Sequence, residues 1–236
     1  MQSVSRAAPV VLVPGLFGTP RLFAEQVPQL WRSGPVTVAG RMQHENLSDI
    51  TRDLLEQAPP TFTLVGLSLG GYVAFEVLRQ APERVEKLAL LGTSARPDTP
   101  EQSERRAEQI AFAENGGFDE IPDLAYPSLV HHRRQGDDAL RATVREMARE
   151  TGALTFVRQQ RATMSRPDSR PLLASITCPT LVLVGADDAL IPPEMSAEIA
   201  RGIPGARHVV VPECGHLSTL EEPGRVSREL VDLVES

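Results

Sequence analysis

The chain has 236 residues, a net charge of −7 and a pI near 5.3. Hydrophobic residues make up 41% and charged residues 23% of it, values typical of a globular protein that can bury a core. The acidic balance argues against binding to nucleic acid or to an anionic membrane, and no apolar stretch reaches the ~18 residues of a membrane span. Residues 1–8 lack the apolar run of a secretory signal, so we expect a cytoplasmic protein.

Six short apolar runs without polar alternation predict strands that are buried on both faces of a parallel sheet. They are residues 9–13, 36–39, 62–65, 88–91, 180–184 and 208–211. Helical patterns between and after them cover residues 22–30, 47–57, 69–80, 194–201 and 224–234. This alternation predicts an α/β fold, in which helices flank a mostly parallel central sheet of about six strands.

The alternation breaks between Pro97 and Pro171, where no strand-like run occurs. Helical patterns instead cover residues 101–114, 137–151 and 153–164. Prolines at both borders punctuate the stretch. We therefore expect an all-helical insertion at 98–170 and a core built from 1–97 and 171–236.

The segment Gly66-Leu67-Ser68-Leu69-Gly70 is a G-x-S-x-G pattern between a predicted strand and a predicted helix. This context is typical of a nucleophile elbow, a sharp turn at which side chains two residues before and after the serine would collide. The pattern predicts Ser68 as the nucleophile. The alternative is a glycine-rich turn whose serine only caps a helix.

The loop from Pro14 to Gly18 follows the first predicted strand. An oxyanion hole takes one backbone N–H from such a loop and one from the residue after the nucleophile. We expect these donors to be Leu16 and Leu69. An ordinary turn after a strand is the alternative.

Acid and base candidates follow the last two predicted strands. Asp187 and Asp188 come directly after one, and Gly215-His216 after the other. The chain order Ser, Asp, His is the one expected of a serine hydrolase on an open α/β sheet, with His216 as general base. The adjacent aspartates leave the acid open between the two positions.

The other polar candidates have less specific contexts. We expect surface or satisfied roles for the remaining histidines, which are His44, His131, His132 and His208. Cys178 and Cys214 match no disulfide framework or zinc pattern and are expected to be buried free thiols.

Taken together, these motifs resemble the α/β-hydrolase superfamily over essentially the whole chain, in particular its carboxylesterase and enol-lactonase-like branch. The resemblance implies Asp188, three residues after Gly185, as the acid, which leaves Asp187 a turn role. It also implies that residues 98–170 form a helical cap. Two departures are Pro14, where many relatives have histidine, and the missing or shortened antiparallel strands that often open the fold.

The resulting expectation is a serine hydrolase that cleaves a small to medium ester, lactone or thioester through an acyl-enzyme. No metal or organic cofactor is indicated, the partner is a small-molecule substrate, and no pattern fixes the oligomeric state. Apolar pocket walls are expected from Phe17, Ile191 and Leu217, beside the oxyanion donors.

Alternatives that keep the triad are carbon–carbon bond hydrolysis and perhydrolysis, because fold and triad do not fix the chemistry. A non-catalytic ligand-binding protein on this fold is a third reading. Polar residues of the insertion could face the pocket, although exposed arginines are the more common case. They are Tyr126, His131, Arg133, Arg134 and Arg158.

Overall fold

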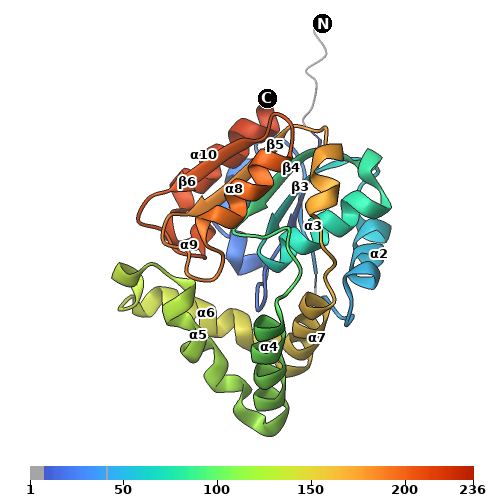
Figure 1. Cartoon of the computed structure of the whole chain (residues 1–236). Coiled ribbons are helices and arrows are strands. Elements are labelled where there is room, and N and C mark those ends of the chain that lie inside the picture. Colours follow the sequence, from blue (N-terminus) through green and yellow to red (C-terminus); the bar gives the residue numbers. More distant parts are fainter. Residues whose placement is uncertain (1–7, 41) are drawn as a thin grey trace, which may run out of the picture.

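The computed structural model describes residues 8–40 and 42–236, and its centre is one six-stranded sheet (Figure 1). All strands pair in parallel, in the order β2-β1-β3-β4-β5-β6. The strands are β1 (Val10–Val13), β2 (Val36–Val38), β3 (Phe62–Leu67), β4 (Val85–Leu91), β5 (Thr180–Gly185) and β6 (Arg207–Val211). The predicted α/β fold with about six parallel strands is confirmed.

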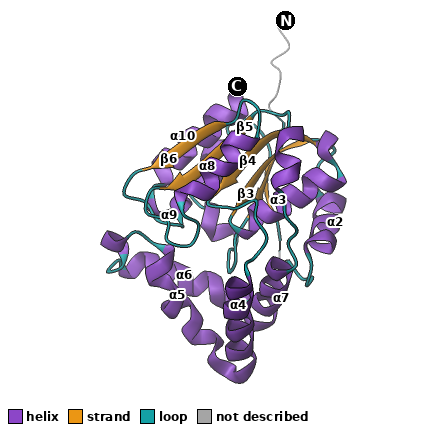
Figure 2. Ribbon diagram, viewed as in Figure 1, coloured by secondary structure: helices purple, strands orange, loops and turns teal. Residues whose placement is uncertain are grey.

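Helices cover both faces of the sheet (Figure 2). One face packs against α1 (Gln26–Leu30) and α10 (Pro223–Glu235), and the other against α2 (Leu47–Gln57), α3 (Leu69–Gln80) and α8 (Pro193–Gly202). Successive β1 residues alternate between the two cores, with Leu12 in the first and Val13 in the second. This double burial explains the continuous apolar runs. Within the described residues, no helix is both long and apolar enough to cross a membrane.

Four helices occupy the chain between β4 and β5, and we call residues 98–170 the cap segment. They are α4 (Pro100–Phe112), α5 (Ile121–Leu129), α6 (Asp138–Thr151) and α7 (Ala153–Met164). They lie beyond the edge of the sheet that is opposite to the C-terminus (Figure 1). Helix α5 was not predicted from the sequence, because Pro122 and Pro127 break its helical pattern even though both are accommodated in the helix.

The single helix predicted for residues 22–30 is wrong. A 3₁₀ turn at Pro20–Phe23 is followed by the five-residue helix α1. Pro28 lies within α1 and has no N–H to donate to the carbonyl four residues earlier, so a regular helix cannot run back through this position.

The two cysteines and the single lysine of the chain lie within or beside the sheet core. Cys214 is buried, Cys178 is half-buried, and both are free thiols. Lys87 of β4 is the only lysine in the chain, and its ammonium donates to the carbonyls of Val234 (2.8 Å) and Ser236 (3.0 Å). This amine therefore ties the C-terminus to the sheet.

A capping box stabilises the N-terminus of α4, the first helix of the cap segment, so removing it should lower the stability of the protein. Thr99 Oγ1 accepts from the Gln102 N–H at 3.3 Å, and Gln102 Oε1 accepts from the Thr99 N–H at 3.0 Å. Thr99→Ala removes one of these bonds and should lower the free energy of unfolding by about 1 kcal/mol. Urea unfolding checks this. Ser103→Ala in the same helix, whose hydroxyl makes no hydrogen bond in the described chain, should cost less; equal losses would contradict the prediction.

Candidate active site

Ser68 lies at a strained turn between β3 and α3. Its φ of 55° and ψ of −113° place it outside the regions that ordinary residues prefer, at a cost of about 1–3 kcal/mol. A Cβ on Gly66 would collide with the backbone of Gly70, and one on Gly70 with the carbonyl of Val13. The predicted steric role of both glycines is therefore visible in the packing. The Ser68 N–H donates to the Leu91 carbonyl at 2.9 Å, which fixes the turn to β4.

The loop after β1 lies directly against this turn. Gly15 approaches Ser68 so closely that a Cβ on the glycine would be 3.2 Å from the serine Cβ. Gly18 N–H donates to the Gly15 carbonyl at 2.9 Å and closes the loop. The N–H groups of Leu16 and Leu69 have no acceptor among the described residues, and Leu69 is the first residue of α3, where helix N–H groups are free. Of the two expected oxyanion donors, Leu69 directly follows Ser68 in the chain, and Leu16 directly follows Gly15, which lies against the serine.

Phe17 belongs to this loop and is packed against the cap segment. It has a left-handed φ of 60°, which costs a non-glycine residue about 1–2 kcal/mol. Its N–H donates to Gln159 Oε1 at 3.2 Å, its carbonyl accepts from Thr151 Oγ1 at 2.8 Å, and its ring stacks on Phe156 with centroids 5.0 Å apart. Buried hydrogen bonds of about 1 kcal/mol each are enough to offset that strain.

His216 and Asp188 form a buried pair. His216 Nδ1 lies 2.8 Å from Asp188 Oδ2, and the two residues are 4% and 3% exposed. Asp188 Oδ1 also accepts the N–H groups of Leu190 (2.9 Å) and Ile191 (2.8 Å), so the carboxylate is held in one orientation. The side chain of Asp187 is 47% exposed and lies 3.5 Å from His131 Nε2. Of the two aspartates, Asp188 is the one in contact with His216.

The protonation equilibrium of His216 reflects two opposing effects. Burial favours the neutral ring and lowers its pKa, whereas the charge and hydrogen bond of Asp188, followed by the charge of Glu221, raise it. The raising effects together outweigh burial, so the pKa of His216 lies above its ordinary value. Such a ring binds a proton more readily than a free histidine.

Ser68 and His216 lie against two successive residues at the carboxyl end of β4, Leu91 and Gly92. Gly92, with φ of 47°, follows the Leu91 carbonyl that Ser68 binds, and a Cβ on it would lie 3.4 Å from His216 Nδ1 and 3.3 Å from Asp188 Oδ2. No hydrogen bond joins the Ser68 hydroxyl to His216 within the described part of the chain. Catalytic hydrogen bonds often tighten only when substrate binds. Gly92 was not predicted as a site residue, because its only signal in the sequence is a glycine directly after a predicted strand.

Main-chain bonds attach the loop carrying His216 to the end of α5. The N–H groups of His216 and Leu217 both donate to the Leu129 carbonyl, at 3.0 and 3.1 Å. Leu217 itself is buried in the core, and Ile191 is half-buried beside Asp188. Of the three expected pocket walls, Ile191 and Leu217 therefore lie next to the pair, whereas Phe17 lies in the loop after β1, and Phe17 and Leu217 are both packed against protein.

Most polar residues proposed for a pocket have structural partners instead. Tyr126 is fully buried, and its hydroxyl donates to the carbonyls of Arg134 (2.9 Å) and Asp137 (3.1 Å). Arg133 is exposed and paired with Glu213. The Nε2 atoms of His44 and His208 have partners in Asp53 and Ser196, and the buried His131 ring accepts from the Arg133 N–H and lies 3.5 Å from Asp187. Arg158 is half-buried.

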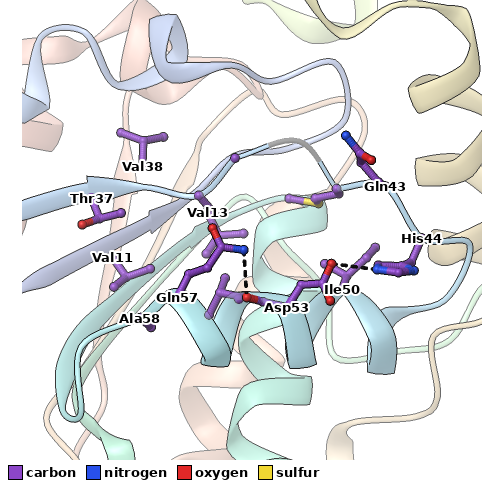
Figure 3. A pocket seen from close by; sticks show the side chains of 14 residues that line it. Val11, Val13, Thr37, Val38, Gln43, His44, Ile50, Asp53, Gln57 and Ala58 are labelled. Atoms are coloured by element: carbon purple, nitrogen blue, oxygen red, sulfur yellow. Dashed lines mark hydrogen bonds and ion pairs between the residues drawn. The ribbon is translucent and has the colours of Figure 1, made fainter.

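A cavity of about 350 Å³ opens between β2 and α2 rather than beside Ser68 (Figure 3). Val11, Val38 and Ile50 are among its apolar lining, and His44 and Asp53 face each other across 2.7 Å at its polar side. None of the predicted site residues lines it. Across the described residues, no cluster of three or more His, Cys, Asp or Glu side chains is placed to hold a metal ion.

Comparison with known proteins identifies the family. A family model described as the alpha/beta hydrolase fold matches residues 37–223, which is more than half of the chain. The chain belongs to the α/β-hydrolase family. The resemblance expected from the motifs is thus confirmed.

Similar α/β hydrolases carry several enzyme names. A thermophilic esterase from Thermogutta terrifontis, solved with malate bound, is 30% identical, with a TM-score of 0.87 over 95% of this chain and 88% of that chain. A pimeloyl-acyl-carrier-protein methyl ester esterase from Pectobacterium atrosepticum is 28% identical over 78% of this chain and 74% of its own length. A Mycobacterium tuberculosis protein named as a candidate non-heme bromoperoxidase is 26% identical over 71% of this chain, which spans 66% of that relative. Two of these three proteins are thus named as esterases and the third as a bromoperoxidase.

The contacts of this α/β hydrolase predict how its His216 titrates. The ring pKa should exceed the ~6.5 of an unperturbed histidine. Asp188→Asn removes the raising charge and leaves burial dominant, so the pKa should fall below that value, whereas Asp187→Asn should change it little. NMR titration of the His216 ring in the three proteins measures this. A larger fall in the Asp187 variant would contradict the pairing.

Proposed function

We propose that this protein is a serine hydrolase that cleaves a carboxylic ester, lactone or thioester with a small to medium, largely apolar acyl group. The observation that carries the proposal is the buried 2.8 Å pair of His216 and Asp188 at the sheet edge where the strained Ser68 lies. The free N–H groups of Leu16 and Leu69 beside Ser68 supply the second requirement of acyl transfer, donors for a developing oxyanion.

In the acylation step, neutral His216 removes the Ser68 hydroxyl proton through Nε2 while the serine oxygen attacks the substrate carbonyl. The carbonyl oxygen becomes an anion that the N–H groups of Leu16 and Leu69 stabilise. His216 then gives the proton to the leaving alcohol or thiol, and the carbon–oxygen or carbon–sulfur bond breaks. This leaves an acyl ester on Ser68.

Deacylation repeats the sequence with water. His216 removes a proton from water as its oxygen attacks the acyl carbon, and it returns that proton to Ser68 as the ester bond breaks. Asp188 fixes the ring with Nδ1 as donor and stabilises the imidazolium in both steps. Asp187, half exposed and facing His131, takes no part. These steps require no metal or organic cofactor.

The names of two relatives, both esterases, support an ester as the substrate. The bromoperoxidase name of a third favours perhydrolysis as the second candidate, in which hydrogen peroxide replaces water and releases a peracid. Both reactions share the acyl-enzyme, so assays of ester hydrolysis and of peracid formation from acetate and peroxide separate them.

Ser68 should react with a fluorophosphonate probe, because the phosphoryl oxygen of the probe mimics the oxyanion and can accept the N–H groups of Leu16 and Leu69. We expect one label per chain on Ser68, none in Ser68→Ala, and loss of nearly all p-nitrophenyl acetate hydrolysis in that variant. Mass spectrometry of the labelled peptide measures the first result. Folded protein that takes no label, with wild-type hydrolysis in Ser68→Ala, would overturn the proposal.

The two aspartates should differ sharply in catalysis. Asp188→Asn should reduce kcat on the order of 10³–10⁴-fold, because the amide favours the wrong histidine tautomer, while Asp187→Asn should change kcat by less than about tenfold. Since His216 acts as a base, wild-type kcat/KM should fall as the pH drops through its raised pKa. Steady-state kinetics across pH test both statements, and the reverse order of the two variants would reassign the acid.

A further inference from the structure

Glu221 is a buried carboxylate that the proposed mechanism does not use. It ends the short helix α9 (Ser218–Glu221) and is 3% exposed. Its Oε1 accepts from the Gly215 N–H at 3.1 Å, and its Oε2 accepts from the His131 N–H at 2.6 Å. Burying a carboxylate is costly unless it is paired or hydrogen-bonded, so this arrangement needs an explanation.

The two donors belong to the parts of the chain that meet at the proposed base. Gly215 directly precedes His216, and His131 follows α5 in the cap segment. These segments are packed so tightly that a Cβ on Gly215 would lie 2.5 Å from the His131 nitrogen and 2.6 Å from the Val130 carbonyl carbon. Together with the bonds to the Leu129 carbonyl, Glu221 thus fixes three successive N–H groups, those of residues 215–217.

Several charged or titratable groups face this carboxylate. His131 donates its backbone N–H to the carboxylate, as does the uncharged Gly215. The Arg134 guanidinium donates to the main-chain carbonyl of Glu221 at 3.2 Å, and the Cys214 thiol lies nearby. Burial raises the pKa of Glu221, and the two backbone hydrogen bonds and the charges of Arg134 and His131 oppose that rise. On the other side, Glu221 adds to the effect of Asp188 in raising the pKa of His216.

We propose that Glu221 is a positioning residue for His216, which holds the Gly215 peptide against the cap segment and so aims the imidazole at Ser68. This inference rests on the proposed function, because it assumes that His216 is the base. It adds a second carboxylate to the control of that histidine. It also makes the end of α5 part of the catalytic framework.

Glu221→Gln is a nearly isosteric test. Each carboxylate oxygen of Glu221 accepts one N–H, but a carboxamide has one oxygen and one NH₂ group, so one backbone donor would face another donor. Glu222→Gln is the matched control, because it removes the same charge one residue away from a half-buried side chain with no hydrogen bond or ion pair in the described chain.

With p-nitrophenyl acetate, Glu221→Gln should lower kcat about 10- to 100-fold with little change in KM, since small misplacements of a catalytic group cost that much. The acid limb of its kcat/KM profile should also move to lower pH, because His216 loses a nearby negative charge. Glu222→Gln should change neither quantity appreciably. A purely structural role would not move the acid limb.

The inference is overturned if folded Glu221→Gln keeps kcat within twofold and an unshifted acid limb, even if its Tm falls. Should that variant not fold, Glu221→Asp keeps the charge but is too short to reach both donors. Glu221→Asp should have a reduced kcat and the acid limb of the wild type, and a wild-type kcat in this variant would overturn the inference.

Fluorophosphonate labelling of the wild type separates the two proposals. An unlabelled wild type refutes the serine mechanism, whereas equal labelling rates in wild type and Glu221→Gln refute only the role of Glu221.

Discussion

The common direction of all six strands is the constraint on which the proposed site depends. Parallel pairing from β2 to β6 brings the carboxyl ends of the strands to one edge, so the loops that follow β1, β3, β5 and β6 converge there. A serine, an aspartate and a histidine that are distant in the chain thereby adjoin the same stretch of β4. Reversing one of these strands would carry its loop to the opposite edge, and the arrangement would be lost.

The cap segment forms hydrogen bonds with two loops of this site, the loop after β1 and the loop that carries His216. Thr151 and Gln159 bind the carbonyl and N–H of Phe17, next to one expected oxyanion donor. The Leu129 carbonyl, at the end of α5, accepts the N–H groups of His216 and Leu217. The strained Phe17 and the histidine loop therefore both form hydrogen bonds with this segment.

The local patterns in the sequence predicted the strands, the elbow at Ser68 and the family, because each depends on residues close together in the chain. The choice between Asp187 and Asp188 needed the family, since adjacent aspartates differ only in which way the loop turns them. The role suggested for Glu221 had no local signal, because one of its two donors lies 90 residues away. Helix α5 was missed because proline, usually a helix breaker, is tolerated there within the helix.

Lys87 gives the molecule an unusual chemical asymmetry. It is the only lysine side chain, and it is bound to the C-terminal residues, on the side of the sheet away from the cap segment (Figure 1). Among side chains, reagents that couple to primary amines therefore have a single point of attachment. Protein immobilised through it on a solid support would present the cap segment, and the sheet edge beneath it, to the surrounding solution.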